Sequence, residues 1–132
     1  MRGSVATSST TIIWRWRATP ACALPGDLGQ IELRADAHGP VNLAALGARL
    51  TVRWRRGGER LAIAPGGPRR ALKSLLRESR LAPAQRARLP LVYSGARLVA
   101  VADLWLDASV QAGPRTARRA RFVWSPSPGT GA

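Results

Sequence analysis

Apolar and polar residues alternate along several short stretches of this chain, and a period of two is typical of half-buried β-strands. In the clearest stretch, which spans residues 50–56, Leu50, Val52 and Trp54 would share one face. Thr51, Arg53 and Arg55 would share the opposite face. Further strands are predicted at 11–17, 30–36, 60–64 and 91–93, within 97–106, and at 122–124.

A helical period is confined to the middle of the chain. Leu72, Leu75 and Leu76 form an apolar stripe at i, i+3 and i+4, which predicts a helix over 71–79. A proline begins the segment 83–88, where it suits the first position of a second, short helix. Strands dominate, so we predict an α+β fold with an antiparallel or mixed sheet. The βαβα alternation of nucleotide-binding folds is missing.

Composition divides the chain into three parts. We expect a disordered leader over 1–10, one domain over 11–111, and a basic, then Pro/Gly/Ser-rich tail over 112–132. No apolar run approaches the ~20 residues that a membrane span needs, and the N-terminus lacks a signal-peptide core. We therefore expect a cytoplasmic protein with no membrane partner.

The charge is strongly unbalanced. The chain has 21 basic and 7 acidic residues, for a formal net charge of +14, and Lys73 is its single lysine. The preference for arginine fits phosphate recognition by planar, bidentate donors, and it also fits a GC-rich genome. Genomic bias does not explain the net charge, because it supplies Asp and Glu as well. The imbalance predicts a polyanionic partner.

Residues for catalysis or metal binding are missing from the pattern. Cys22 and His38 are each the single residue of their type, which excludes a Cys/His metal cluster. We find no phosphate-binding loop of the Gly-x-x-x-x-Gly-Lys-Ser/Thr or Ser-Gly-Gly-x-Asp-Ser type, and no paired carboxylates. We therefore expect no catalytic, metal-binding or cofactor-binding residue in this chain.

Two groups of basic residues are candidates for RNA binding. The first surrounds Gly57-Gly58, which predicts a tight hairpin turn, and the second would follow one side of the predicted helix at steps of 3, 4 and 3. Either group could instead be a solvated surface. The first group is Arg53, Arg55, Arg56 and Arg60, and the second is Arg70, Lys73, Arg77 and Arg80.

Other features leave their role open. The arginines between 115 and 121 would add nonspecific affinity or form a solvated tail. Tryptophan can stack on unpaired bases, but Trp54 lies on the apolar face of its strand, which favours the core. Trp16 and Trp124 adjoin charged residues and fit either role.

The order and spacing of several segments resemble the C-terminal domain of bacterial tRNA(Ile)-lysidine synthases, over roughly residues 24–106. The family often has Ile-Pro-Pro-Trp before its arginine, and the aromatic is lost here, where residues 81–85 precede Arg86, so local packing is expected to differ. The segments are Arg53-Trp54-Arg55-Arg56-Gly57-Gly58-Glu59-Arg60, residues 70–78, Pro83, Arg86, residues 89–92 and residues 98–102.

This resemblance implies a function. The family's enzymes use ATP to adenylate the wobble cytidine of an isoleucine tRNA and then attach lysine. Their catalytic ATP-pyrophosphatase domain lies N-terminal, and the C-terminal domain helps to hold the tRNA, at the acceptor arm. The resemblance implies a β-sandwich-like α+β fold and tRNA contacts by Arg55, Arg60, Arg70 and Lys73.

Three hypotheses follow for a chain without the ATP-binding domain, which could be a separate domain, a mis-started gene or a stand-alone relative. The first is a tRNA-binding domain, with tRNA(Ile) as the expected partner and ATP used only by the catalytic domain. The second is a structural domain that packs on the catalytic domain. The third, a small enzyme, has little support because no acid/base pair is visible.

Overall fold

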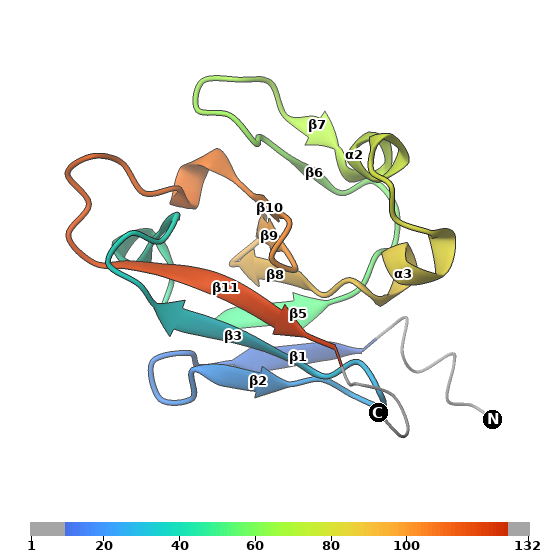
Figure 1. Cartoon of the computed structure of the whole chain (residues 1–132), viewed down its shortest axis with the longest axis horizontal. Coiled ribbons are helices and arrows are strands. Elements are labelled where there is room, and N and C mark those ends of the chain that lie inside the picture. Colours follow the sequence, from blue (N-terminus) through green and yellow to red (C-terminus); the bar gives the residue numbers. More distant parts are fainter. Residues whose placement is uncertain (1–9, 127–132) are drawn as a thin grey trace.

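Strands β8 (Leu91–Ser94) and β9 (Arg97–Val101) lie at the centre of the protein, between two other layers (Figure 1). The computed structural model describes residues 10–126. The two strands belong to a five-stranded antiparallel sheet of order β1-β5-β8-β9-β10. The remaining strands of this first sheet are β1 (Thr11–Trp14), β5 (Leu50–Arg53) and β10 (Trp105–Leu106).

A second antiparallel sheet packs against one face of the first. Its order is β2-β3-β11-β4, and Figure 1 shows the long strand β11 beside β3. Its strands are β2 (Ala21–Ala23), β3 (Gln30–Ala35), β4 (Val41–Asn42) and β11 (Arg119–Ser125). The short 3-10 helices η1 (Leu43–Ala45) and η2 (Ala108–Val110) lie in the connections. Side chains of both sheets form one core, among them Trp14, Ile31, Leu50, Val52, Trp54, Val92 and Phe122.

A third layer covers the other face of β8 and β9. It consists of the strand pair β6 (Arg60–Leu61) and β7 (Arg70–Ala71), followed by helices α2 (Leu72–Glu78) and α3 (Pro83–Arg88). The leucine stripe of α2 is buried, as its spacing predicts. This layer and the first sheet share a second core: Leu61, Leu72, Leu75, Leu76 and Leu89 pack with Leu91, Tyr93, Leu98 and Val101.

The layering explains why two strands of the first sheet have different patterns of buried and exposed residues. A strand covered on both faces has apolar residues at every position, and all residues of 98–102 are buried. Strand β5 lies toward the sheet margin and keeps its alternation, with Leu50 and Val52 buried and Thr51 and Arg53 only half-buried. The arginine side of β5 therefore remains accessible.

The structure confirms the predicted α+β, strand-rich class, and every strand pair is antiparallel. Helix α2 is one residue shorter at each end than the predicted 71–79, and α3 spans the predicted 83–88. Trp54 is buried in the core, as its place on the apolar face predicted.

The predicted hairpin at Gly57-Gly58 is wrong. Strand β5 pairs with β1 and β8, whereas β6 pairs with β7. The two segments flanking the glycines therefore belong to different sheets. The predicted hairpin failed because the alternation of 50–56 and 60–64 indicates strands but carries no information about their partners.

The predicted boundary at residue 111 is also wrong. Strand β11 pairs along its length with β3, and Ala120 and Phe122 belong to the core. The basic residues around them suggested a tail, but Arg121 forms an ion pair with Asp36 at 2.6 Å, and Arg119 donates to the carbonyl of Gly39 at 2.9 Å. Residues 1–9 of the expected leader lie outside the described residues. Residues 127–132, the end of the expected tail, lie outside them as well.

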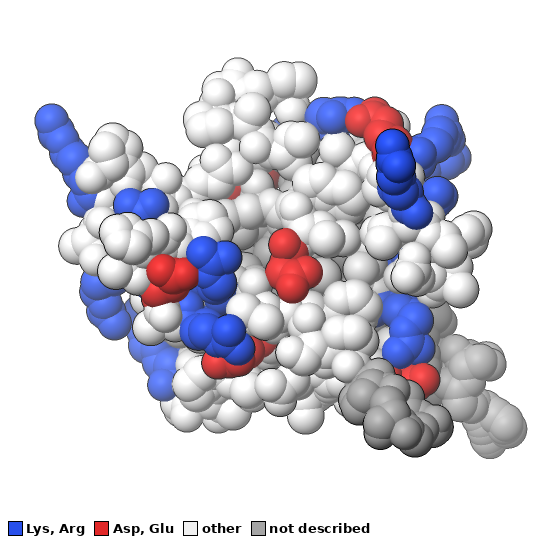
Figure 2. Space-filling view, viewed as in Figure 1, with Lys and Arg blue, Asp and Glu red and all other residues white. Residues whose placement is uncertain are grey.

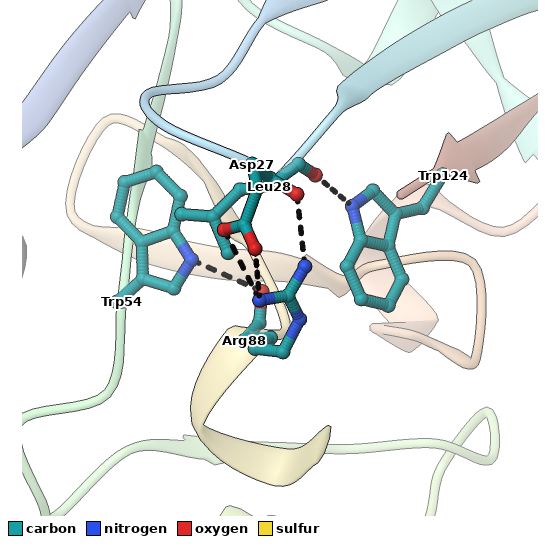
Figure 3. A network of polar contacts seen from close by, with 5 residues as sticks. All are labelled: Asp27, Leu28, Trp54, Arg88 and Trp124. Atoms are coloured by element: carbon teal, nitrogen blue, oxygen red, sulfur yellow. Dashed lines mark hydrogen bonds and ion pairs between the residues drawn. The ribbon is translucent and has the colours of Figure 1, made fainter. Parts of the chain in front are cut away.

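A polar network joins α3 to both sheets (Figure 3). The guanidinium of Arg88 donates to the side chain of Asp27 at 3.2 and 3.3 Å and to its carbonyl at 2.8 Å. The indole of Trp54 donates to the carbonyl of Arg88 at 3.2 Å, and the indole of Trp124 donates to that of Leu28 at 3.0 Å. The turn between β2 and β3 is thus tied to α3 and β11.

Asp107 is the buried carboxylate that joins the third layer to η2. It accepts hydrogen bonds from the backbone N–H of Ala62 at 2.8 Å and of Ser109 at 3.1 Å, and from the Ser109 hydroxyl. Burial raises the pKa of Asp107, but these hydrogen bonds and the nearby Arg97 outweigh that effect and hold the pKa below its ordinary value. The ionised form is therefore the one that stabilises the fold.

We predict that Asp107→Asn lowers the free energy of unfolding at pH 7 by about 2–3 kcal/mol, because an amide nitrogen would then face a backbone donor. Since the folded pKa of Asp107 is lowered, its contribution is complete above the unfolded pKa of about 4 and is lost as the pH falls through the folded value. Urea denaturation between pH 7 and pH 3 should show that the difference in free energy of unfolding between the parent chain and Asp107→Asn becomes smaller as the pH falls. A constant gap would contradict the assignment.

Candidate nucleic-acid interface

All seven acidic residues of the chain lie within the described part, and each already has a structural partner. Five form ion pairs, and Glu59 and Asp103 accept hydrogen bonds from backbone N–H groups. The ion pairs are Glu32–Arg34, Glu78–Arg70, Asp27–Arg88, Asp107–Arg97 and Asp36–Arg121. The remaining described arginines and Lys73 therefore have no carboxylate within ion-pair distance.

These unneutralised cations are not spread evenly. Many of them follow β5 in the chain or lie on β6, on α2 and in the loop before β7. In the view of Figure 2, basic side chains gather toward the two ends of the molecule, whereas most of the middle is uncharged. The unneutralised basic residues of this stretch, called the basic cluster below, are Arg53, Arg55, Arg56, Arg60, Arg69, Lys73, Arg77 and Arg80.

Four arginines of this cluster line one cavity of about 290 Å³. Arg53 comes from the end of β5, Arg56 from the following loop, Arg60 from β6 and Arg69 from the loop before β7. The ring of Tyr93 and the side chains of Ala96 and Leu98 also line the cavity. We call it the arginine cavity.

Tyr93 holds the first of these arginines. The guanidinium carbon of Arg53 lies 3.9 Å from the centroid of the Tyr93 ring, in a cation–π contact. Tyr93 is itself buried in the second core, between β8 and the third layer. The position of Arg53 therefore depends on the central sheet as well as on its own strand.

Arg60 and Arg69 hold each other across the short β6–β7 pair. Arg60 donates to the carbonyl of Arg69 at 2.8 Å, and Arg69 donates to the carbonyl of Arg60 at 3.2 Å. A guanidinium has five N–H donors, so one such bond leaves the others available. Both side chains are exposed.

Glu59 shapes the loop that carries Arg56. Its carboxylate accepts from the N–H of Arg56 at 2.6 Å and from that of Gly57 at 3.0 and 3.2 Å. Gly57 and Gly58 have φ values of 107° and 84°, a region that favours glycine. The carbonyl of Glu59 also accepts from the N–H of Leu72, at the start of α2. The Gly-Gly-Glu-Arg segment is therefore a structural link as well as a carrier of charge.

Arg55 is placed differently from its neighbours. It does not line the arginine cavity, and it is half-buried. Its Nε is buried, and no described group accepts a hydrogen bond from it. The predicted site thus contains one arginine whose aliphatic stem is part of the packing.

The predicted helical stripe is only partly correct. Lys73 and Arg77 are exposed on α2, but Arg70 lies in β7 and pairs with Glu78, and Arg80 follows the helix end at Ser79. Spacing alone suggested one continuous row, because the prediction extended the helical register beyond the helix. Arg69 and Tyr93 were missed, since no local sequence pattern connects them to Arg53.

Other kinds of site find no support in the described residues. Within 10–126, no group of three or more His, Cys, Asp or Glu side chains is arranged to hold a metal ion. None of the helices in this part of the chain has the length and apolar character to cross a membrane.

The fold and the basic cluster define a small, strand-rich α+β domain with a strongly cationic surface. A family model described as the TilS substrate C-terminal domain matches residues 50–124. The chain belongs to this family. The match includes the arginine cavity, α2, α3 and all of β11 except its last residue.

Several curated relatives of this chain are tRNA(Ile)-lysidine synthases. The protein of Ralstonia nicotianae is 47% identical over 78 residues, which cover 59% of this chain and 17% of the relative. That of Pseudomonas putida is 42% identical over 91 residues, covering 67% and 21%. That of Coxiella burnetii is 30% identical over 101 residues, covering 76% and 22%. The chain spans about a fifth of the length of these relatives.

A solved structure has the same fold. The crystal structure of a TILS C-terminal domain superposes with a TM-score of 0.66 and covers 89% of this chain and 98% of that chain. The two sequences are 23% identical, so this likeness supports the architecture.

We predict that Glu59→Ala lowers the free energy of unfolding by about 1–2 kcal/mol, because three backbone contacts to a charged acceptor are lost. Glu78→Ala removes the same charge but only an exposed ion pair, so it should cost at most about 1 kcal/mol. Chemical denaturation of both variants checks the difference. An equal decrease in the free energy of unfolding for the two variants would show that the Glu59 contacts do not shape the loop.

Proposed function

We propose that this chain is a tRNA-binding domain that contributes to ATP-dependent lysidine formation on tRNA(Ile) without catalysing it. The observation that carries the proposal is the set of arginines and Lys73 between residues 53 and 80 that have no carboxylate within ion-pair distance. Basic groups at neighbouring surface positions repel each other, and a bound polyanion relieves that repulsion. Binding to phosphates would also release counterions, which favours the complex.

The choice of tRNA follows from the family. The relatives are tRNA(Ile)-lysidine synthases, and the matched segment is described as their substrate C-terminal domain. Phosphate contacts fix position but do not identify the sequence of an RNA. We therefore expect weak sequence preference, with ATP and lysine handled by a catalytic domain of the synthase. The reaction would take place in the cytoplasm.

The second candidate function is docking onto the catalytic domain, and one observation favours it. A cavity of about 360 Å³ lies between β10 and β11, lined by Leu104, Trp105 and Val123 among others. Leu104 is 46% exposed and is one of two large apolar side chains so exposed in the described chain. An exposed apolar residue beside a cavity suits a protein contact better than a phosphate contact.

We predict that affinity for tRNA(Ile) falls steeply with salt, with a slope of log K against log salt of about −5 if six phosphates are contacted. Arg56→Glu with Lys73→Glu, both exposed, should weaken binding by at least about 10-fold at 0.1 M salt. Fluorescence anisotropy with labelled tRNA at several salt concentrations checks both values.

The control is Arg115→Glu with Arg118→Glu, which makes the same change in net charge on an exposed loop outside the cluster. If net charge alone mattered, the two double variants would lose equal affinity, and the assigned surface would be wrong. Binding that is insensitive to salt, or no binding by the parent chain, would contradict the proposed function. Melting curves of both variants check that they are folded.

A further inference from the structure

The arginine cavity collects more positive charge than a general RNA-contacting surface requires. Four arginines, from β5, the loop after it, β6 and the loop before β7, line a single cavity. The one carboxylate among the lining residues is Glu59, and its oxygens accept from the N–H groups of Arg56 and Gly57. Four arginines and one glutamate leave the lining with a formal charge of +3, and none of the four arginines forms an ion pair.

Three of the four arginines are also held in place. Arg53 lies over the ring of Tyr93, and Arg60 and Arg69 donate to each other's carbonyl groups. These contacts fix the side chains while most of their donors remain available. Binding an anion there would require less ordering of side chains than binding on freely rotating surface arginines.

The floor of the cavity strengthens any such contact. Tyr93 and Leu98 are buried beneath it, and both belong to the second core. Electrostatic interactions beside apolar groups are stronger than in open solvent. Guanidinium forks match the tetrahedral oxygens of phosphate in a bidentate manner.

We propose that the arginine cavity is a binding site for one phosphate group, with Arg69 as a phosphate ligand and Tyr93 as the residue that positions Arg53. The identification of the phosphate with that of an RNA rests on the proposed function. It can be an internal phosphodiester or the terminal phosphate at a 5′ end. Both sources present the same oxygens to the four arginines.

The first experiment uses the whole chain and inorganic phosphate alone. Phosphate is titrated at constant ionic strength, with chloride as the replaced anion, while the arginine Nε–H signals are followed by NMR. We expect the signals of Arg53, Arg56, Arg60 and Arg69 to shift together and to saturate. Small shifts that increase linearly at every arginine would overturn the proposal, because they would show only counterion accumulation.

The variant for this site is Arg69→Gln, since Arg69 is exposed and its loss leaves the core unchanged. It should weaken phosphate binding by about 10-fold or more, as expected for loss of a charged ligand. Arg118→Gln, an equal change of charge on an exposed loop, should leave phosphate affinity within about twofold because screening limits its effect. Equal effects of the two variants would refute a site in the cavity.

Two RNA hairpins of identical sequence, one with a 5′-phosphate and one with a 5′-hydroxyl, distinguish the sources. If a terminal phosphate is bound, the hydroxyl form binds more weakly and Arg69→Gln removes the difference. If an internal phosphate is bound, both hairpins bind equally and Arg69→Gln weakens both. If Arg69→Gln weakens neither hairpin more than Arg118→Gln does, the cavity is not an RNA site.

The two proposals fail in different ways. Saturable phosphate binding without RNA binding by the parent chain would contradict the proposed function and leave the phosphate site standing. RNA binding that survives Arg69→Gln, together with no saturable phosphate shift, would contradict the phosphate site and leave the proposed function standing.

Discussion

The burial of β8 and β9 on both faces is the constraint on which the rest of the structure depends. The second sheet covers one face, and the β6–β7 pair with α2 and α3 covers the other. This third layer does not cover β5 in the same way, so the arginine side of that strand stays accessible. The arginine cavity forms where Arg53, at the end of β5, meets Tyr93 from the doubly covered strand β8.

The distribution of charge follows from the use of the acidic residues. Each of the seven carboxylates has a structural partner: Asp107 joins two layers, Glu59 shapes a loop, and Asp27 ties a turn to α3. None of the seven forms an ion pair with a residue of the basic cluster, so the positive charges of the cluster have no ion-pair partner. The fold thus separates acids that stabilise it from arginines that are available to a ligand.

Local patterns predicted the elements better than their partners. The leucine spacing located α2, the proline located α3, and the alternation at 50–55 assigned the correct faces. The same alternation suggested a hairpin between segments that belong to different sheets, and the arginines after residue 112 suggested a tail where β11 completes the second sheet. Both errors arise because pairing and burial depend on residues far away in the sequence.

The sequence by itself determined the class of the fold, the excess of arginine and the family resemblance, since periodicity, composition and motif order are properties of the linear chain. Only the tertiary structure decided which basic residues lie together. Arg53, Arg56, Arg60 and Arg69 converge, whereas Arg70 pairs with Glu78 and Arg55 is half-buried. Tyr93 joins the site because β8 pairs with β5 within one sheet, and that pairing between segments far apart in the sequence is recorded by no local pattern.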